Sequence, residues 1–193
     1  MKRTPKIVII FHSSTGTTKR LAHAIAKGVD NQQLGSSQLI EIIGQDIQHG
    51  RYLNQATLSA ITEADAVIWG SPTYMGSVSA QFKSFADATG DVWDNQLWAG
   101  KLAAGFTIGA NYCGDQLMTL QYMQVLASQH GMIWIGLDIA GGQDTQGRNR
   151  LGTQIGLASQ TRDTDVPDID LITAEYLGGR VARALSFVLD RKL

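Results

Sequence analysis

The sequence predicts an α/β protein built on a doubly wound parallel sheet. Apolar, β-branched runs of strand length alternate along the chain with segments of helical periodicity. Each strand–helix–strand unit of this kind implies a right-handed crossover between parallel strands. The 193 residues are enough for one such unit with a sizeable core. We therefore expect residues 1–193 to form a single domain, with helices on both faces of the sheet.

Five runs have the character of strands. The first, IVIIF, is continuously β-branched or aromatic, as expected for a strand that is buried on both faces. The predicted strands span residues 7–11, 38–43, 66–69, 102–108 and 132–137. Because parallel α/β sheets bind ligands beyond the carboxyl ends of their strands, at the switch point, the segments that follow the first, third, fourth and fifth of these strands are the candidate binding loops.

The segments between the strands carry helical signals of unequal strength. Helices are predicted at 21–29, weakly at 57–64, at 78–88, at 115–129, and near the C-terminus around 174–188. By contrast, residues 138–170 are rich in Gly, Gln, Thr and Asp and have no clear period. A loop of this length is too long for a plain connector, and such loops tend to be functional.

The composition narrows the class of protein. With 44% hydrophobic and 17% charged residues and a net charge of −1, the chain is globular and has no basic field to attract nucleic acid or anionic lipid. Its four histidines lack metal-ligand spacing, so no metal is expected. The single cysteine, Cys113, fits a reducing compartment, and we expect it to be a passive small residue. No stretch approaches membrane-spanning length, and a cytoplasmic location is expected.

The loop after the first strand, Ser13–Thr18, has the sequence SSTGTT, with five hydroxyl side chains in six residues. It opens the first helix, where unpaired backbone N–H groups and the helix dipole favour an anion. Gly16 allows a close backbone approach or a positive φ. The loop therefore predicts a phosphate site. The alternative is a Ser/Thr N-cap with extra polar neighbours, while the nucleotide patterns GxxxxGK[ST] and GxGxxG are absent.

Three later loops are less distinctive. In GSPTYMGSVSAQF (70–82), Pro72 is expected to end the third strand, and Tyr74 and Met75 suit the face or rim of a flat ring. An ordinary turn is the alternative. TIGANYCGDQ (107–116) holds residues that permit unusual φ and ψ angles, and Trp93 lies in a further loop of little periodicity.

The loop at 13–18 resembles the FMN phosphate loop of flavodoxins. The blocks GSPTYMGSVSAQFKSFADATGDVW, HGMIWIGL and GTQIGLASQ resemble, in order and spacing, the flavodoxin-like NAD(P)H:quinone oxidoreductases of the tryptophan-repressor-binding-protein family. This resemblance implies a flavodoxin-like sheet of strand order 2-1-3-4-5. It also implies FMN as cofactor, NAD(P)H as co-substrate, a quinone as acceptor, and a homotetramer whose sites are lined by more than one chain.

The resemblance assigns the FMN contacts to particular residues. The phosphate would be held by Ser13, Ser14, Thr15, Gly16, Thr17 and Thr18. The ring would be bordered by Pro72, Thr73, Tyr74, Met75 and Gly76 on one side and by Thr107, Ile108, Gly109, Ala110 and Asn111 on the other. Gln129 and His130 would also reach the flavin, with a surface or capped histidine as the alternative for His130. Trp93 would wall the substrate pocket, although tryptophans in such a loop are more usually partial core or interface anchors. The chain departs from the family at Tyr74, Met75 and Gln129, where Arg, Phe and His are usual.

The implied reaction passes a hydride from NAD(P)H through flavin N5 and delivers two electrons to a quinone. No residue must act as a general acid, although His130 and Tyr74 are candidates. Two alternatives stay open, a flavodoxin-type electron carrier and a non-enzymatic FMN-binding protein. A phosphoryl-receiver domain is excluded, because the first and third strands end in Phe11-His12-Ser13 and Trp69-Gly70-Ser71, without the carboxylates that hold Mg²⁺.

Overall fold

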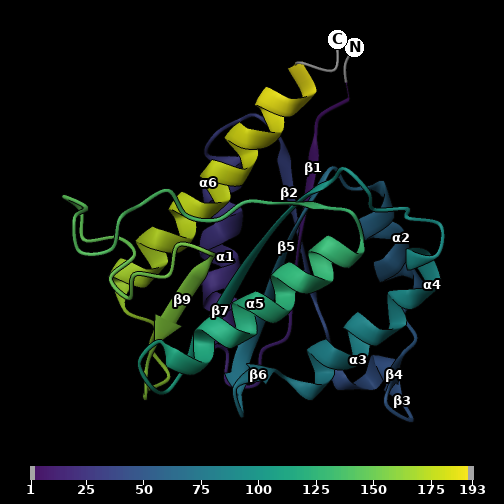
Figure 1. The fold of residues 1–193 in the computed structure, drawn as a ribbon, viewed down its shortest axis with the longest axis horizontal. Helices are drawn as coiled ribbons and strands as arrows, with labels where there is room; N and C mark the ends of the chain where they lie inside the picture. Colours follow the sequence, from purple (N-terminus) through teal and green to yellow (C-terminus); the bar gives the residue numbers. More distant parts are fainter. Residues whose placement is uncertain (1–2, 191–193) are drawn as a thin grey trace.

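The computed structural model describes residues 3–190, and its centre is a parallel sheet (Figure 1). The main strands follow the spatial order β2-β1-β5-β7-β8, which confirms the predicted order 2-1-3-4-5. Their bounds are Lys6–Phe11 for β1, Ser36–Glu41 for β2, Ala66–Tyr74 for β5, Leu102–Gly109 for β7 and Ile133–Trp134 for β8.

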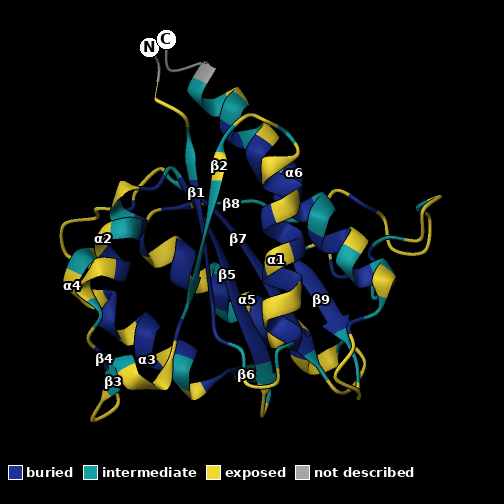
Figure 2. Ribbon diagram, turned by 180° about the vertical axis from the view of Figure 1, so that it is seen from behind, coloured by how far each residue is buried: buried dark blue, intermediate teal, exposed yellow. Residues whose placement is uncertain are grey.

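Helices cover both faces of this sheet, as predicted. One face packs on α1 (Thr17–Asp30) and α6 (Asp168–Asp190). The other packs on α2 (Gln55–Glu63), α3 (Ala80–Ala88) and α5 (Gly114–Gln129), with the short α4 (Gly90–Trp93) following α3. Figure 2 shows the central strands almost wholly buried between these layers. No helix among residues 3–190 is both long and apolar enough to span a bilayer.

The helices α1 and α6 approach each other backbone to backbone. A Cβ atom at Gly28 would lie 1.9 Å from the carbonyl oxygen of Glu175, and one at Gly178 would lie 2.1 Å from that of Ile25. Glycine is therefore required at both positions by space rather than by backbone angle. This contact fixes the position of α1, and the predicted phosphate loop at 13–18 leads into the first turn of this helix.

The third predicted strand is longer than expected, because Pro72 does not end it. β5 runs to Tyr74, with Pro72 in register with Ile108 of β7. The Gly70 carbonyl accepts from the His12 N–H, so the backbone of Gly70 is directed toward β1. The backbone nitrogen of Pro72, two residues further on, is directed to the same side. Since β1 has already ended at Phe11, no ladder bond is lost there.

After Tyr74 the chain turns back in a tight hairpin. The short β6 (Ser77–Val78) pairs antiparallel with the end of β5. Ser79 then caps α3, its hydroxyl accepting from the Phe82 N–H at 3.2 Å. The helix predicted from residue 78 therefore begins at Ala80.

The fifth predicted strand is divided into two pieces. β8 pairs with Leu102 and Ala103 of β7, and β9 (Leu157–Gln160) pairs with Phe106–Gly109 further along the same edge. The Leu137 N–H donates to the Gln154 carbonyl as the chain returns. The long loop predicted at 138–170 thus contains a strand, and the residues after β9 arrive at the carboxyl edge.

A small hairpin of β3 (Ile47–Gln48) and β4 (Arg51–Tyr52), preceded by a 3-10 turn at Gly44–Asp46, was not predicted either. It lies between β2 and α2 in the sequence. β2 itself begins two residues before its predicted start, at Ser36, and ends at Glu41.

Candidate functional site

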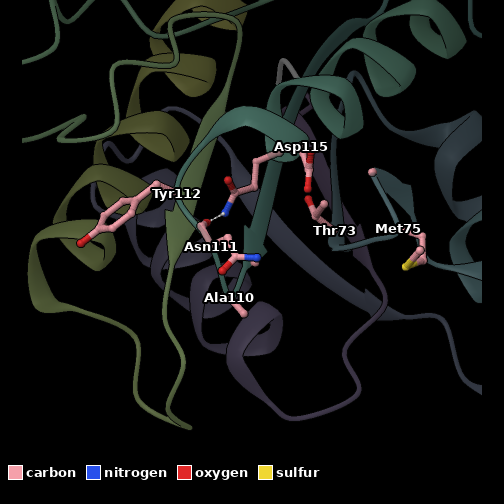
Figure 3. A pocket seen from close by; sticks show the side chains of 9 residues that line it. Thr73, Met75, Ala110, Asn111, Tyr112 and Asp115 are labelled. Carbon is pink, nitrogen blue, oxygen red and sulfur yellow. Dashed lines mark hydrogen bonds between the residues drawn. The ribbon is translucent and has the colours of Figure 1, made fainter.

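The loops that follow β1, β5, β7 and β9 meet at the carboxyl edge of the sheet, around two adjoining cavities. The smaller, about 290 Å³, is lined from the Ser13–Thr18 loop by Thr15 and Thr17. The larger, about 380 Å³, lies between the β5–β6 turn and the start of α5 (Figure 3). Both cavities are lined by Thr73, Gly109 and Ala110, so they form one continuous site.

The Ser13–Thr18 loop has the geometry of an anion nest. Gly16 is the residue before the helix, with φ 89° and space for a Cβ, so its left-handed backbone rather than crowding requires glycine. The N–H groups of the following first turn have no partner within the helix. Of the five hydroxyls, Ser13 Oγ accepts from the Lys19 N–H at 3.2 Å. Capping therefore explains one hydroxyl, and Thr15 and Thr17 face the cavity.

The larger cavity is a slot between two loops. One wall is the turn at Met75 and Gly76, both with positive φ (48° and 77°), and the other is the loop 109–112. The side chains of Met75 and Tyr112 are 104% and 74% exposed, so apolar surface stands open to solvent at the mouth. Positive φ at both central residues is the geometry of a type I′ hairpin, whose twist matches that of the strands on either side.

Three threonine hydroxyls form a directed chain beneath the site. Thr107 Oγ1 donates to the Ser71 carbonyl at 2.7 Å, which uses its only hydrogen. Thr73 therefore donates to Thr107 at 2.8 Å. Because Thr73 has no second hydrogen, its 2.9 Å bond with Thr119 uses the Thr119 hydrogen, for which the Asp115 carbonyl at 3.4 Å is the longer alternative. The Thr73 hydroxyl can therefore accept a hydrogen bond from a ligand but cannot donate one.

Gln116 is a site residue that sequence reasoning missed. Its side-chain NH₂ donates to the carbonyls of Asn111 (2.9 Å) and Ser159 (3.0 Å), which fixes the direction of the amide. Its Oε1 is buried on the wall of the larger cavity and has no partner among the described residues. A Cβ at Gly109 would lie 2.9 Å from Gln116 Nε2, so the glycine makes room for this contact. No sequence pattern distinguishes Gln116 from the other glutamines of the chain as a binding residue.

The long loop at 138–170 was expected to be functional, but the residues of it that reach the site, after β9, were not identified. Gln160 Nε2 donates to the Ala110 carbonyl at 3.0 Å, and the Arg162 guanidinium reaches Asn111 Oδ1 at 3.3 Å. Arg162 and Asp163 line the smaller cavity opposite Thr15 and Thr17. This segment therefore closes the site from the β9 side.

These features fit FMN. The anion nest suits a phosphate, the slot between the two loops suits a planar ring, and the acceptors at Thr73 and Gln116 suit groups that carry hydrogen. The predicted residues of the loops at 13–18, 72–76 and 107–111 all lie at this edge, on the segments that enclose the two cavities.

The structure does not bring Gln129, His130 and Trp93 to this edge. Helix α5 begins at the cavity and runs away from it for sixteen residues, roughly 24 Å at 1.5 Å per residue. Gln129 is its last residue, and Trp93 Nε1 donates to the Gln129 carbonyl at 2.9 Å. These three residues therefore cluster at the opposite edge within one chain.

His130 is a core residue there. It is 1% exposed, its Nε2 lies 2.8 Å from Thr89 Oγ1, and its ring packs on Trp98 with centroids 4.5 Å apart. Burial lowers the pKa of His130 to about 4. Cys113, half-buried beside the site, has its thiol pKa raised by burial, which fits the passive role expected of it.

The buried imidazole predicts a pH dependence of stability. Between pH 6.5 and 4 the unfolded chain binds a proton that native His130 does not, so the free energy of unfolding falls as the pH drops through this window. We expect a loss of about 2 kcal/mol from this group between pH 7 and pH 5. Urea denaturation at pH 7 and pH 5 should show a smaller loss of unfolding free energy for His130→Gln than for the wild type. If the wild type and His130→Gln lost the same unfolding free energy between pH 7 and pH 5, the pH dependence would not come from His130. Burial also lowers the pKa of His12, but His12 is present in both proteins and its contribution cancels in the comparison.

Comparisons with known proteins identify the family of this chain. Residues 5–146 match the family model described as NADPH-dependent FMN reductase. Flavodoxin FldP of Pseudomonas aeruginosa (strain UCBPP-PA14) is 37% identical, covering 92% of this chain and 95% of its own. An NAD(P)H dehydrogenase (quinone) of Archaeoglobus fulgidus is 34% identical over the same shares. The crystal structure of a flavodoxin, WrbA-like protein from Agrobacterium tumefaciens is similar with a TM-score of 0.76 and 35% identity, covering 94% of this chain and 98% of that one.

The family match covers most of the chain and includes three of the four loops that enclose the cavities. It confirms the predicted resemblance to flavin-dependent oxidoreductases that use NAD(P)H. The chain therefore belongs to the NADPH-dependent FMN reductase family.

Proposed function

We propose that this protein reduces quinones by two electrons, with NAD(P)H as reductant and FMN as cofactor. The observation that carries the proposal is the pair of adjoining cavities, one at the anion nest and one between the loops after β5 and β7. When bound, FMN supplies at N5 an atom that accepts a hydride from one substrate and gives it to the next. The relatives named NAD(P)H dehydrogenase (quinone) support the reaction.

The chain's own residues bind and orient the reactants. Backbone N–H groups and the hydroxyls of Thr15 and Thr17 hold the phosphate, and the turn at Met75 and Gly76 flanks the ring. The open mouth of the larger cavity lets NAD(P)H and then the quinone stack in turn at the same place. Tyr74, 45% exposed, lines the adjoining smaller cavity and is a candidate proton donor. Solvent at the open mouth of the larger cavity is an alternative source of protons.

We also propose a homotetramer in the cytoplasm. In its own chain Trp93 lies at the edge opposite the cavities, yet its side chain is 46% exposed. Only the Trp93 of a neighbouring copy can therefore wall a substrate pocket. Exposed apolar side chains at Met118 and Val125 along α5 suit such packing. Native mass spectrometry of the FMN-loaded protein should give a tetramer, and a monomer at micromolar concentration would contradict this.

The second candidate is a flavodoxin-type electron carrier. The relative at 37% identity is named a flavodoxin, which favours it. Against it stands the net charge of −1, which provides little steering toward a redox partner. A non-enzymatic FMN-binding protein would share the same site.

Stoichiometry separates these functions. In anaerobic turnover with a neutral benzoquinone, we expect one NADPH oxidised for each hydroquinone formed. A carrier or a binding protein would leave NADPH unoxidised under the same conditions. That outcome would reject the reductase while leaving FMN binding intact.

A further inference from the structure

A carboxylate lies on the wall of the larger cavity. Asp115 is the second residue of α5, is exposed, and lines the cavity together with Thr73 and Met75. Figure 3 shows its side chain extending from the start of the helix toward Thr73. The other described residues that line this cavity are neutral, so its lining carries a net negative charge.

No cation neutralises this group within the described part of the chain. Asp115 takes part in none of the ion pairs formed by residues 3–190. Arg162 reaches the neighbouring Asn111 but lines the smaller cavity, where Asp163 offsets its charge.

The remainder of the mouth is apolar. Met75 and Tyr112 present a thioether and a phenol ring to solvent on either side of the slot. Such surfaces accept the flat body of an aromatic acceptor with little regard to its substituents. Among acceptors of similar shape, the charged residue of the cavity lining, Asp115, is then the group that can distinguish one from another.

We propose that Asp115 selects the electron acceptor by charge, favouring neutral and cationic aromatic quinones over those bearing a sulfonate or carboxylate. The inference rests on the proposed function, because it places the quinone at the cavity mouth. In that reaction the quinone takes a hydride and a proton, NAD(P)H is oxidised, and Asp115 forms and breaks no bond. It acts across space on the substituent of the acceptor.

The test compares three 1,4-naphthoquinones: unsubstituted, 2-sulfonated, and bearing a trimethylammonium group. The FMN-loaded wild type, Asp115→Asn, and Glu63→Gln are assayed for kcat/KM. The dissociation constant of each quinone from the oxidised protein is measured by the change in flavin absorbance. Glu63 is the exposed last residue of α2, outside both cavities, so its variant controls for the same change in net charge.

We expect Asp115→Asn to raise kcat/KM and affinity for the sulfonate about tenfold relative to the neutral quinone, and to lower both for the cation by a similar factor. Added salt should shrink both effects. Because each quinone is compared with itself across proteins, differences in quinone potential cancel. Glu63→Gln should match the wild type.

The assignment to Asp115 would be overturned if Asp115→Asn changed kcat/KM and affinity by the same factor for all three quinones. It would also be overturned if Glu63→Gln changed them as Asp115→Asn does. Absence of turnover of the neutral quinone by the wild type would instead count against the proposed function. The dissociation constants would still decide the role of Asp115 in that case.

Discussion

Thr17→Asp should lower the affinity for FMN about 100-fold or more, while the affinity for riboflavin changes by less than about threefold. Thr17 lies at the first position of α1, on the wall of the smaller cavity. A carboxylate there would meet the FMN phosphate in a partly desolvated site, where like charges a few ångströms apart repel by several kcal/mol. Riboflavin lacks the phosphate and should bind through the ring slot alone.

The fold should tolerate this change. The first turn of α1 contains no acidic residue, and a carboxylate at a helix N-terminus is favourable to the helix. Thr17→Asn, which has the same shape without the charge, is the matched control and should keep FMN affinity within about tenfold. Both ligands can be titrated by quenching of flavin fluorescence. Equal losses for FMN and riboflavin in Thr17→Asp would contradict a phosphate site at this loop.

Asp170→Asn should cost about 3 kcal/mol of unfolding free energy. Asp170 is 1% exposed, and its carboxylate accepts from Arg150 Nε and Nη2, both at 2.8 Å, and from Ser159 Oγ at 2.7 Å. This cluster ties α6 to β9 and to the long excursion between β8 and β9. The Asp170 side chain is buried, whereas that of Arg150 is 28% exposed. Removing the buried carboxylate leaves the Arg150 charge without its partner, which is more costly than losing a surface pair.

The matched control is Asp165→Asn. Asp165 pairs with Arg20 at 2.5 Å but its side chain is 88% exposed, so we expect a loss below about 1 kcal/mol. Guanidinium denaturation of both variants at pH 7 measures the difference directly. An Asp170→Asn cost no larger than that of Asp165→Asn would show that the cluster does not hold β9 in place.

The phosphate loop could be predicted from the sequence because its evidence is local. A buried strand, a glycine and a run of hydroxyls at a helix start are all contained in residues 6–22. The ring loops at 72–76 and 107–111 were placed by their position after predicted strands, which the parallel topology brings to one edge. The extension of β5 past Pro72 was missed, because it depends on where the neighbouring strand β1 ends.

The rest of the site depends on pairings distant in sequence. β9 joins β7 some fifty residues after it, so no local pattern marks Arg162 and Asp163 as cavity residues. Gln116 matters because its amide is fixed by Asn111 and Ser159, a contact that periodicity cannot reveal. For His130, resemblance placed the residue near a flavin. The length of α5 and the contact with Thr89 place it in the core at the far edge of its own chain.

The most direct test of the account is an anaerobic titration of the FMN-loaded protein with NADPH, followed by the visible absorbance of the flavin. We expect full bleaching within seconds and full recovery of the oxidised spectrum on addition of a benzoquinone. A flavin that binds tightly but stays oxidised under excess NADPH would contradict the reductase and leave an electron carrier or a binding protein.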